Sequence, residues 1–190
     1  MNLQAVHHLI RNRRAIYPVQ FKPQEIPEEI LREILENANW APTHRLTEPW
    51  RFKVITGDAR KRFGTFMAEK YRSLNDLDSF SVGKYEKLKM SPQQSGAVIA
   101  ICLQRDLRER LPEWEELASV AMAVQNMWLT CSAYGIGAYW SSPDLINFFG
   151  EFEPLSVGEK CLGFFYMGYA DQPESSPPRK PIGDKVKWLK

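Results

Sequence analysis

The chain has 190 residues, of which 44% are hydrophobic and 25% are charged, and its net charge is +2. This length fits one ordinary domain, and this composition is typical of a globular protein with a substantial core. So small a net charge gives no support for a nucleic-acid partner or for binding to an anionic membrane.

The cysteines and the N-terminus indicate a compartment. Cys102, Cys131 and Cys161 are odd in number and each lies in an apolar run, so we expect buried, reduced thiols rather than disulfides. Charges follow a short apolar stretch at the N-terminus, which is the reverse of a signal peptide. No run approaches the ~18–20 apolar residues of a membrane span. A cytoplasmic protein without a membrane partner is the expectation.

Hydrophobic spacing predicts helices and a strand in the first half of the chain. Apolar residues on one face predict a helix over 3–13, and Pro27 at a first helical turn predicts a second helix over 27–38. A strand is expected over 50–56 and a third helix over 58–72. The buried face of the strand should carry alternate residues, namely Trp50, Phe52 and Val54.

The second half of the chain alternates irregularly between strands and helices. Residues 73–94 are polar and lack a clean period, which predicts a mobile excursion or short helices. Continuous apolar runs predict buried strands over 97–103 and 161–169. Between them lie a long helix over 113–134 and a strand over 138–141. This order predicts an α+β fold, with a mixed sheet packed by helices.

The long helix over 113–134 is apolar nearly all round, apart from Gln125 and Asn126. Such a helix is buried on most sides, either inside one domain or at a dimer interface. Gly135 is expected to cap it. The stretch over 175–181 is rich in proline and leads to a short tail.

Several catalytic motifs are missing from the sequence. Gly135 and Gly137 begin like a dinucleotide fingerprint, but the third glycine is absent and the motif leads from a helix into a strand, the wrong order. There is no Walker loop, no nucleophile elbow and no cluster with metal-ligand spacing. We therefore expect no metal site and no catalytic nucleophile, and a cofactor would carry the difficult step.

Three segments together carry a recognisable pattern. The first is Arg13–Ala15, where two arginines at a helix end either offset the helix dipole or bind a terminal phosphate. The second, over 41–50, reads APTHRLTEPW, and the third, over 125–140, reads QNMWLTCSAYGIGAYW. With GFFYMGYA over 163–170 and RKPI over 179–182, their order and spacing resemble the nitroreductase family of flavoproteins across nearly the whole chain.

The resemblance implies a single FMN-binding domain over 1–190 with a mixed, mainly antiparallel sheet flanked by helices. It also implies a domain-swapped homodimer. Residues 73–94 would form a variable, lid-like excursion facing the acceptor. Residues 183–190 would form a C-terminal arm that reaches across to the partner.

The resemblance also implies which residues bind FMN. The phosphate would lie at Arg13, Arg14 and Ala15, with added charge from Arg179 or Lys180. His44 and Glu48 would approach the flavin from the other subunit. The isoalloxazine ring or the ribityl chain would be lined by residues at the end of a strand, namely Trp140, Ser141 and Ser142. The flavin itself would carry the chemistry, with His44 as a candidate hydrogen-bond donor to the flavin or the acceptor.

The sequence departs from the family pattern at three of these positions. The usual serine is Ala15, which removes one hydroxyl from the phosphate site. A lysine or arginine that many members place beside flavin N1 is Tyr17, and the usual glutamine is Glu48. FMN binding is still expected, but these changes bear on the redox potential and on the choice of acceptor.

The implied function is transfer of reducing equivalents from NADH or NADPH to a small electrophilic acceptor, such as a nitroaromatic or a quinone, by a ping-pong mechanism. Two alternatives remain open. One is a flavin enzyme of the same fold that removes a halogen or fragments a flavin. The other is a flavin-binding protein without catalytic activity.

Overall fold

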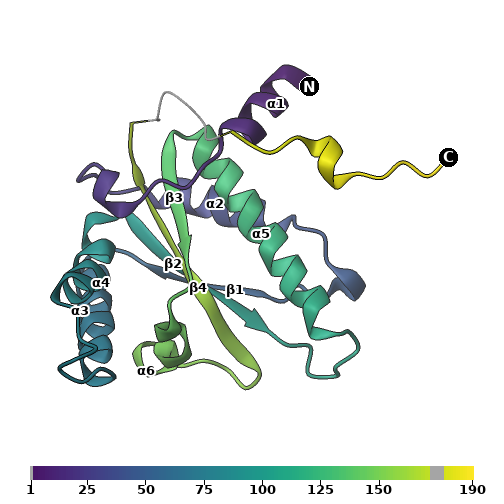
Figure 1. Ribbon diagram of the computed structural model, residues 1–190. Helices are drawn as coiled ribbons and strands as arrows, with labels where there is room; N and C mark the ends of the chain where they lie inside the picture. Colours follow the sequence, from purple (N-terminus) through teal and green to yellow (C-terminus); the bar gives the residue numbers. More distant parts are fainter. Residues whose placement is uncertain (1, 172–177) are drawn as a thin grey trace.

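The structure, a computed structural model, describes residues 2–171 and 178–190, so part of the proline-rich stretch over 175–181 lies outside the described residues. In the described part, four strands form one antiparallel sheet in the order β1-β2-β4-β3. Helices lie on both sides of this sheet (Figure 1), which confirms the predicted α+β fold. The strands are β1 (Trp50–Ile55), β2 (Ala97–Gln104), β3 (Ile136–Ser141) and β4 (Glu159–Tyr169).

Four helices begin and end close to the predicted residues: α1 (Leu3–Asn12), α2 (Glu28–Asn39), α3 (Asp58–Ser73) and α5 (Glu113–Ala133). Two further helices were not predicted with defined ends, namely α4 (Val82–Gln94) and the short α6 (Phe149–Phe152). As predicted, Gly135 follows α5 with a φ of 69°, a left-handed conformation that glycine adopts without steric cost. Among the described residues, no helix has both the length and the apolar character to cross a membrane.

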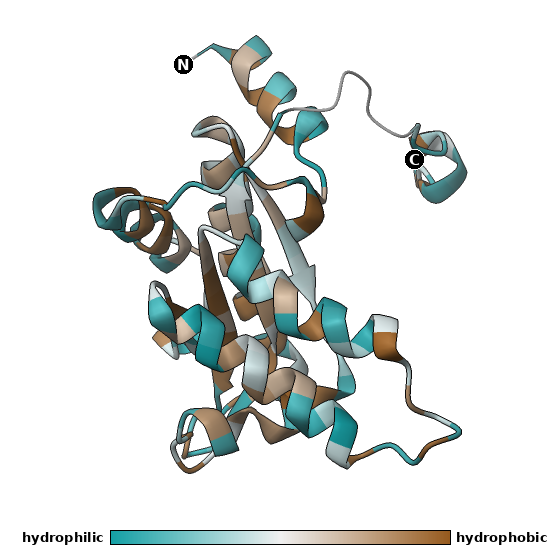
Figure 2. Cartoon of the chain, turned by 90° about the vertical axis from the view of Figure 1, so that its left-hand side faces the viewer, coloured by the Kyte–Doolittle hydropathy of each residue, from teal (hydrophilic) through white to brown (hydrophobic). Residues whose placement is uncertain are grey.

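The sheet separates two hydrophobic cores, and β2 contributes to both. Ile99, Ile101 and Leu103 pack in the core with α2 and α5, whereas alternate residues of β2 such as Val98 and Cys102 pack in the core with α3 and α6. Because both faces of β2 are covered, it is apolar and buried from Ala97 to Leu103, as the continuous run predicted. In Figure 2 part of the sheet is accordingly brown, although one strand is mostly pale, while the helices alternate between brown and teal. The three cysteines are buried and free, as expected.

The prediction that Val54 belongs to the buried face of β1 is wrong. Trp50 and Phe52 pack against the core with α2 and α5, but Val54 is 42% exposed, and Ile55 is buried in the other core. Alternation indicates which side chains share a face of a strand. It does not indicate how far the helices extend over that face.

The excursion over 73–94 contains the helix α4, which packs along α3. Ser81 caps α4 through its side chain, and the two helices approach closely at Gly64, where any side chain would collide with the backbone of Lys89. The connection between the helices is exposed, with Leu77 at 97% exposure. That these residues cover an acceptor site stays a prediction.

Several apolar side chains remain at the surface of the single chain. On α5, Trp114, Leu117 and Met122 are 67%, 42% and 39% exposed, although the opposite face of the helix is fully buried. Helix α1 has no buried residue. Figures 1 and 2 show α1 and the C-terminal segment extending away from the sheet. Trp188 in this segment is 82% exposed.

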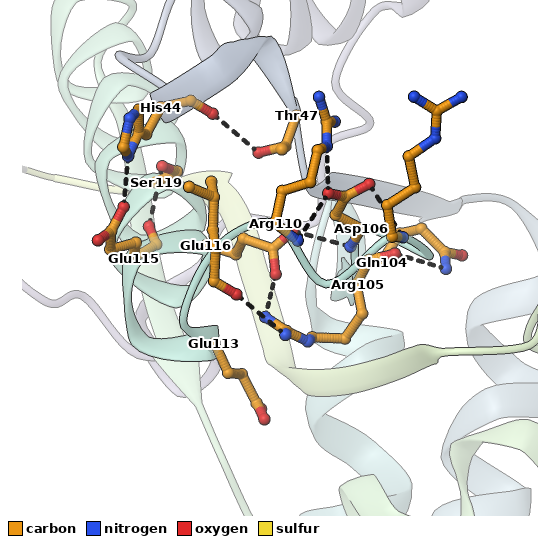
Figure 3. A network of polar contacts seen from close by, with 12 residues as sticks. His44, Thr47, Gln104, Arg105, Asp106, Arg110, Glu113, Glu115, Glu116 and Ser119 are labelled. Atoms are coloured by element: carbon orange, nitrogen blue, oxygen red, sulfur yellow. Dashed lines mark hydrogen bonds and ion pairs between the residues drawn. The ribbon is translucent and has the colours of Figure 1, made fainter.

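A buried carboxylate holds the connection between β2 and α5 (Figure 3). Glu116 is fully buried, accepts a hydrogen bond from the backbone N–H of Asp106 at 2.8 Å, and forms an ion pair with Arg105. The Arg105 guanidinium also donates to the carbonyl of Leu111. The carboxylate thus pairs with the charge of the Arg105 guanidinium and with the Asp106 N–H, neither of which would otherwise be satisfied away from solvent.

Replacing Glu116 by Gln should destabilise the protein by about 3–5 kcal/mol, because the substitution leaves a partly buried guanidinium without its counter-charge. Urea unfolding followed by circular dichroism measures this. Glu113→Gln is the matched control: Glu113 pairs with Lys160 at the surface, and its loss should cost under about 1 kcal/mol. Equal effects of the two substitutions would contradict a stabilising role for the buried pair.

Candidate functional site

Three of the predicted phosphate-binding arginines do lie close together. The positive charges of Arg179 and Arg14 act on Arg13. Partial burial and then these two charges lower the pKa of the Arg13 guanidinium from its ordinary value. Like charges held together in this way repel one another, and a bound anion relieves that repulsion. Arg179 is more than 160 positions away in the sequence, so the fold brings the cluster together.

Trp128 on α5 positions the two early arginines. The guanidinium carbon of Arg13 lies 4.5 Å from the centre of the Trp128 ring, a cation–π contact. The indole N–H of Trp128 donates to the carbonyl of Arg14 at 3.2 Å. Trp128 was not among the predicted site residues, although it lies inside the QNMWL segment that carried the resemblance.

The segment after the arginines runs beside β3. Ala15 forms an isolated parallel bridge with Ala138, and the N–H of Ile16 donates to the Ala138 carbonyl at 3.0 Å. The chains come so near that a Cβ on Gly137 would lie 2.9 Å from Ile16. The predicted sheet was mixed. The named strands are all antiparallel, and this bridge is the parallel element. It joins Arg13–Ala15 to the strand that carries Trp140.

The end of β3 places Trp140 and Ser141 half-buried and leaves Ser142 exposed. The indole of Trp140 packs over Gly163, whose φ of 153° and missing side chain leave room for it. The indole Nε1 is buried and has no hydrogen-bond partner in the described residues. An unpaired buried donor costs about 1–3 kcal/mol.

The loop that carries His44 and Glu48 has a strained backbone. Arg45, Leu46 and Glu48 have φ values of 52°, 51° and 43°, which residues other than glycine rarely adopt. Such strain is concentrated at functional sites, where the surrounding structure maintains it. The backbone N–H of Glu48 donates to the Thr43 hydroxyl at 3.2 Å, and this hydrogen bond closes the loop.

This loop is attached to the other end of α5. The Nδ1 atom of His44 lies 2.6 Å from a carboxylate oxygen of Glu115, in the first turn of the helix (Figure 3). Thirteen residues separate Glu115 from Trp128, and at 1.5 Å per residue they lie about 20 Å apart along the axis. In one chain, therefore, the predicted site residues form two groups at opposite ends of α5.

Lys180 completes the predicted set, and Tyr17 is one of the departures from the family pattern. Lys180 is exposed, and its carbonyl accepts a hydrogen bond from Lys185 at 3.0 Å. Tyr17 is 47% exposed and its ring lies 4.7 Å from that of Tyr139, so the residue in the family's lysine position is held against β3.

Two surface hollows lie on the described part of the chain, the second of them beside the end of α5 that carries Trp128. One of about 360 Å³ includes Phe21, Arg60 and Ser95, and another of about 410 Å³ includes Leu9 and Leu129. No predicted site residue lines either hollow. The guanidinium cluster is suited to an anionic group.

Solved structures with the same fold come from several bacteria. The NfnB nitroreductase of Mycobacterium smegmatis, solved in complex with NADPH, aligns with a TM-score of 0.81 at 19% identity and covers 99% of both chains. A nitroreductase-like family protein of Bacillus cereus aligns with a TM-score of 0.76 at 26% identity, over 97% of this chain and 95% of that one. The fold is that of the nitroreductases.

Sequence comparison identifies the family. The model of the nitroreductase family matches residues 10–169. The protein named "Putative NAD(P)H nitroreductase YfhC", from Bacillus subtilis (strain 168), is 30% identical over 188 residues, covering 93% of this chain and 90% of the relative. The chain belongs to the nitroreductase family and is an oxidoreductase, as the resemblance implied.

Gly163→Ala tests the support beneath Trp140. The added Cβ would lie 2.6 Å from the carbonyl of Ser141 and would overlap the indole. The end of β3 must then shift, and we expect a loss of about 1–3 kcal/mol of stability. Urea unfolding and quenching of tryptophan fluorescence measure the loss and the displacement. Gly150→Ala, whose Cβ would meet only Leu155 at 3.8 Å, is the control and should be close to neutral.

Proposed function

We propose that the protein is an FMN-dependent oxidoreductase that transfers reducing equivalents from NADH or NADPH to small electrophilic acceptors such as quinones and nitroaromatics. The observation that carries the proposal is the guanidinium cluster of Arg13, Arg14 and Arg179, assembled from both ends of the chain beside β3. Supporting it, NfnB was solved as an FMN-dependent enzyme with NADPH, and a Desulfovibrio desulfuricans relative of the same fold was solved with FMN.

In this proposal each part of the candidate site contacts a different part of FMN. Arg13, Arg14 and Arg179 bind the phosphate through charge-assisted hydrogen bonds, and Lys180 adds charge to the same end. Ala15 contributes only its backbone there. The end of β3 lines the ribityl chain and ring through Trp140, Ser141 and Ser142. When bound, FMN supplies the electron-carrying chemistry, for which the side chains themselves have no equivalent.

The active form is proposed to be a homodimer. His44 and Glu48 lie about 20 Å along α5 from the residues that support the arginine cluster, so their approach to the same flavin requires a second copy. The exposed apolar face of α5, with Trp114 and Leu117, provides a surface for that copy. The C-terminal arm over 183–190, whose side chains are exposed in the single chain, would pack against the partner.

Donor and acceptor are proposed to bind in turn at the same flavin face, so that NAD(P)+ leaves before the acceptor enters. Residues 73–94 would then exclude water from the acceptor side. Tyr17 and Glu48, where the family has a cation and an amide, offer a neutral phenol and a carboxylate near the ring. They would stabilise negative charge on the reduced ring less well than the family's usual residues.

Purified protein tests this function directly. It should be yellow, contain about one FMN per chain and have a mass of two chains by light scattering. Anaerobic NADPH or NADH should bleach the visible spectrum, and benzoquinone should restore it. Protein that binds FMN but is not bleached would instead be a flavin-binding protein. Bleaching without oxidation by quinones or nitroaromatics would favour dehalogenation or flavin fragmentation.

Arg13→Ala and Arg179→Ala should each weaken FMN binding by about 10–100-fold, since a charge-assisted hydrogen bond contributes about 1.5–3 kcal/mol. Titration of apoprotein, followed by quenching of FMN fluorescence, gives the affinity. Arg62→Ala is the control, because Arg62 is exposed on α3, and it should leave the affinity unchanged. Wild-type affinity in both cluster variants would exclude this cluster as the phosphate site.

A further inference from the structure

The pair formed by His44 and Glu115 joins the strained loop to the first turn of α5. The two residues are 71 positions apart, and the Nδ1–Oε2 distance is 2.6 Å. Most of the other residues in Figure 3 belong to the network that joins β2 to α5. The His44 side chain itself is 58% exposed, so burial does not account for its place in this network.

Glu115 determines the orientation and the tautomer of the imidazole. A carboxylate only accepts hydrogen bonds, so the hydrogen of this pair is carried by Nδ1 of His44. The Nε2 atom then points away from Glu115, and no described residue bonds to it. A carboxylate that holds one ring nitrogen and leaves the other open is the arrangement of a histidine that transfers protons.

The position of Glu115 is itself well determined. The Ser119 hydroxyl donates to the Glu115 carbonyl at 3.0 Å, and the neighbouring Glu116 is anchored by Arg105 and by the N–H of Asp106. The Glu115 side chain is only 24% exposed. The left-handed residues Arg45 and Leu46 follow His44 directly, so the loop keeps an unfavourable conformation while the imidazole stays on α5.

We propose that His44 donates a proton from Nε2 to the acceptor as it is reduced, and that Glu115 is the positioning residue that holds the imidazole for this step. The inference rests on the proposed function, in which His44 approaches the flavin of the second copy. Trp114 and Leu117, beside Glu115 on α5, are exposed in the single chain, so a second copy would lie against this end of the helix.

The proton is needed because two-electron reduction of a quinone to a hydroquinone consumes two electrons and two protons. NAD(P)H supplies, through the cofactor, the two electrons and one proton as a hydride equivalent. For the second proton, the Nε2–H bond of protonated His44 breaks and an O–H bond forms on the acceptor oxygen. Water then returns a proton to the neutral imidazole.

The test compares an acceptor that needs protons with one that does not. Enzyme reduced anaerobically with NADPH is mixed in a stopped-flow instrument with benzoquinone, or with ferricyanide, which takes one electron and no proton. His44→Asn should slow the reaction with benzoquinone by about 100-fold, the lower end for a general acid. Glu115→Gln should slow it by about 10–100-fold, as for removal of a group that orients a functional histidine. Reaction with ferricyanide should change less than twofold in both variants.

The double variant and a matched control separate positioning from general support. If Glu115 acts through His44, the double variant should be no slower with benzoquinone than His44→Asn alone. Glu113→Gln, in the same turn of α5, should react like the wild type with both acceptors. Should Glu115→Gln lose flavin or fail to fold, His44→Asn alone must still distinguish the two acceptors.

Two results would overturn the inference. One is equal slowing with both acceptors, which is what a purely structural role predicts. The other is an unchanged rate with benzoquinone in His44→Asn. In either case normal FMN content and normal bleaching by NADPH would leave the proposed function standing. Protein without flavin, or flavin that NADPH does not reduce, would instead refute the proposed function.

Discussion

The length of α5 is the constraint on which the candidate site depends. Its 21 residues hold Glu115 and Trp128 about 20 Å apart, and each of these side chains contacts a different set of candidate site residues. Trp128 contacts Arg13 through its ring and donates a hydrogen bond to the carbonyl of Arg14, while Glu115 accepts a hydrogen bond from His44. One face of the helix is buried against the sheet, so neither end can move toward the other. In the proposed dimer, the second copy would bring the two sets to one ligand.

The two ends of α5 differ in charge. The cationic end gathers three guanidinium groups, and partial burial, followed by the charges of Arg179 and Arg14, lowers the pKa of Arg13. The other end carries Glu113, Glu115 and Glu116 in the first turn, where the helix dipole favours carboxylates. Glu116 stabilises the fold, Glu113 lies at the surface, and Glu115 is left to orient His44. Three glutamates in one turn thus have three different roles, which depend on burial and partners.

Much of the fold could be predicted, because local periodicity reflects which faces are buried. The helices over 3–13, 27–38 and 58–72 and the strands over 97–103 and 161–169 were all found within a few residues of their predicted ends. The error in β1 arose because alternation cannot show where a covering helix stops, so Val54 is exposed and Ile55 is buried. Among the site residues, Trp128 and Glu115 were not singled out, since their roles depend on partners more than 70 positions away in the chain.

The sequence alone determined the α+β class, the family, and the residue types available for binding an anion, because these follow from composition, period and motif order. It also placed arginines at 13, 14 and 179 without showing that they meet. Only the tertiary structure decided that these charges converge, that His44 is held by Glu115, and that the two groups lie at opposite ends of one helix. The spacing of hydrophobic residues is a local property of the chain, so it can be read from the sequence. Electrostatic and hydrogen-bonding partners depend on distances in space, and these are determined by how the elements pack.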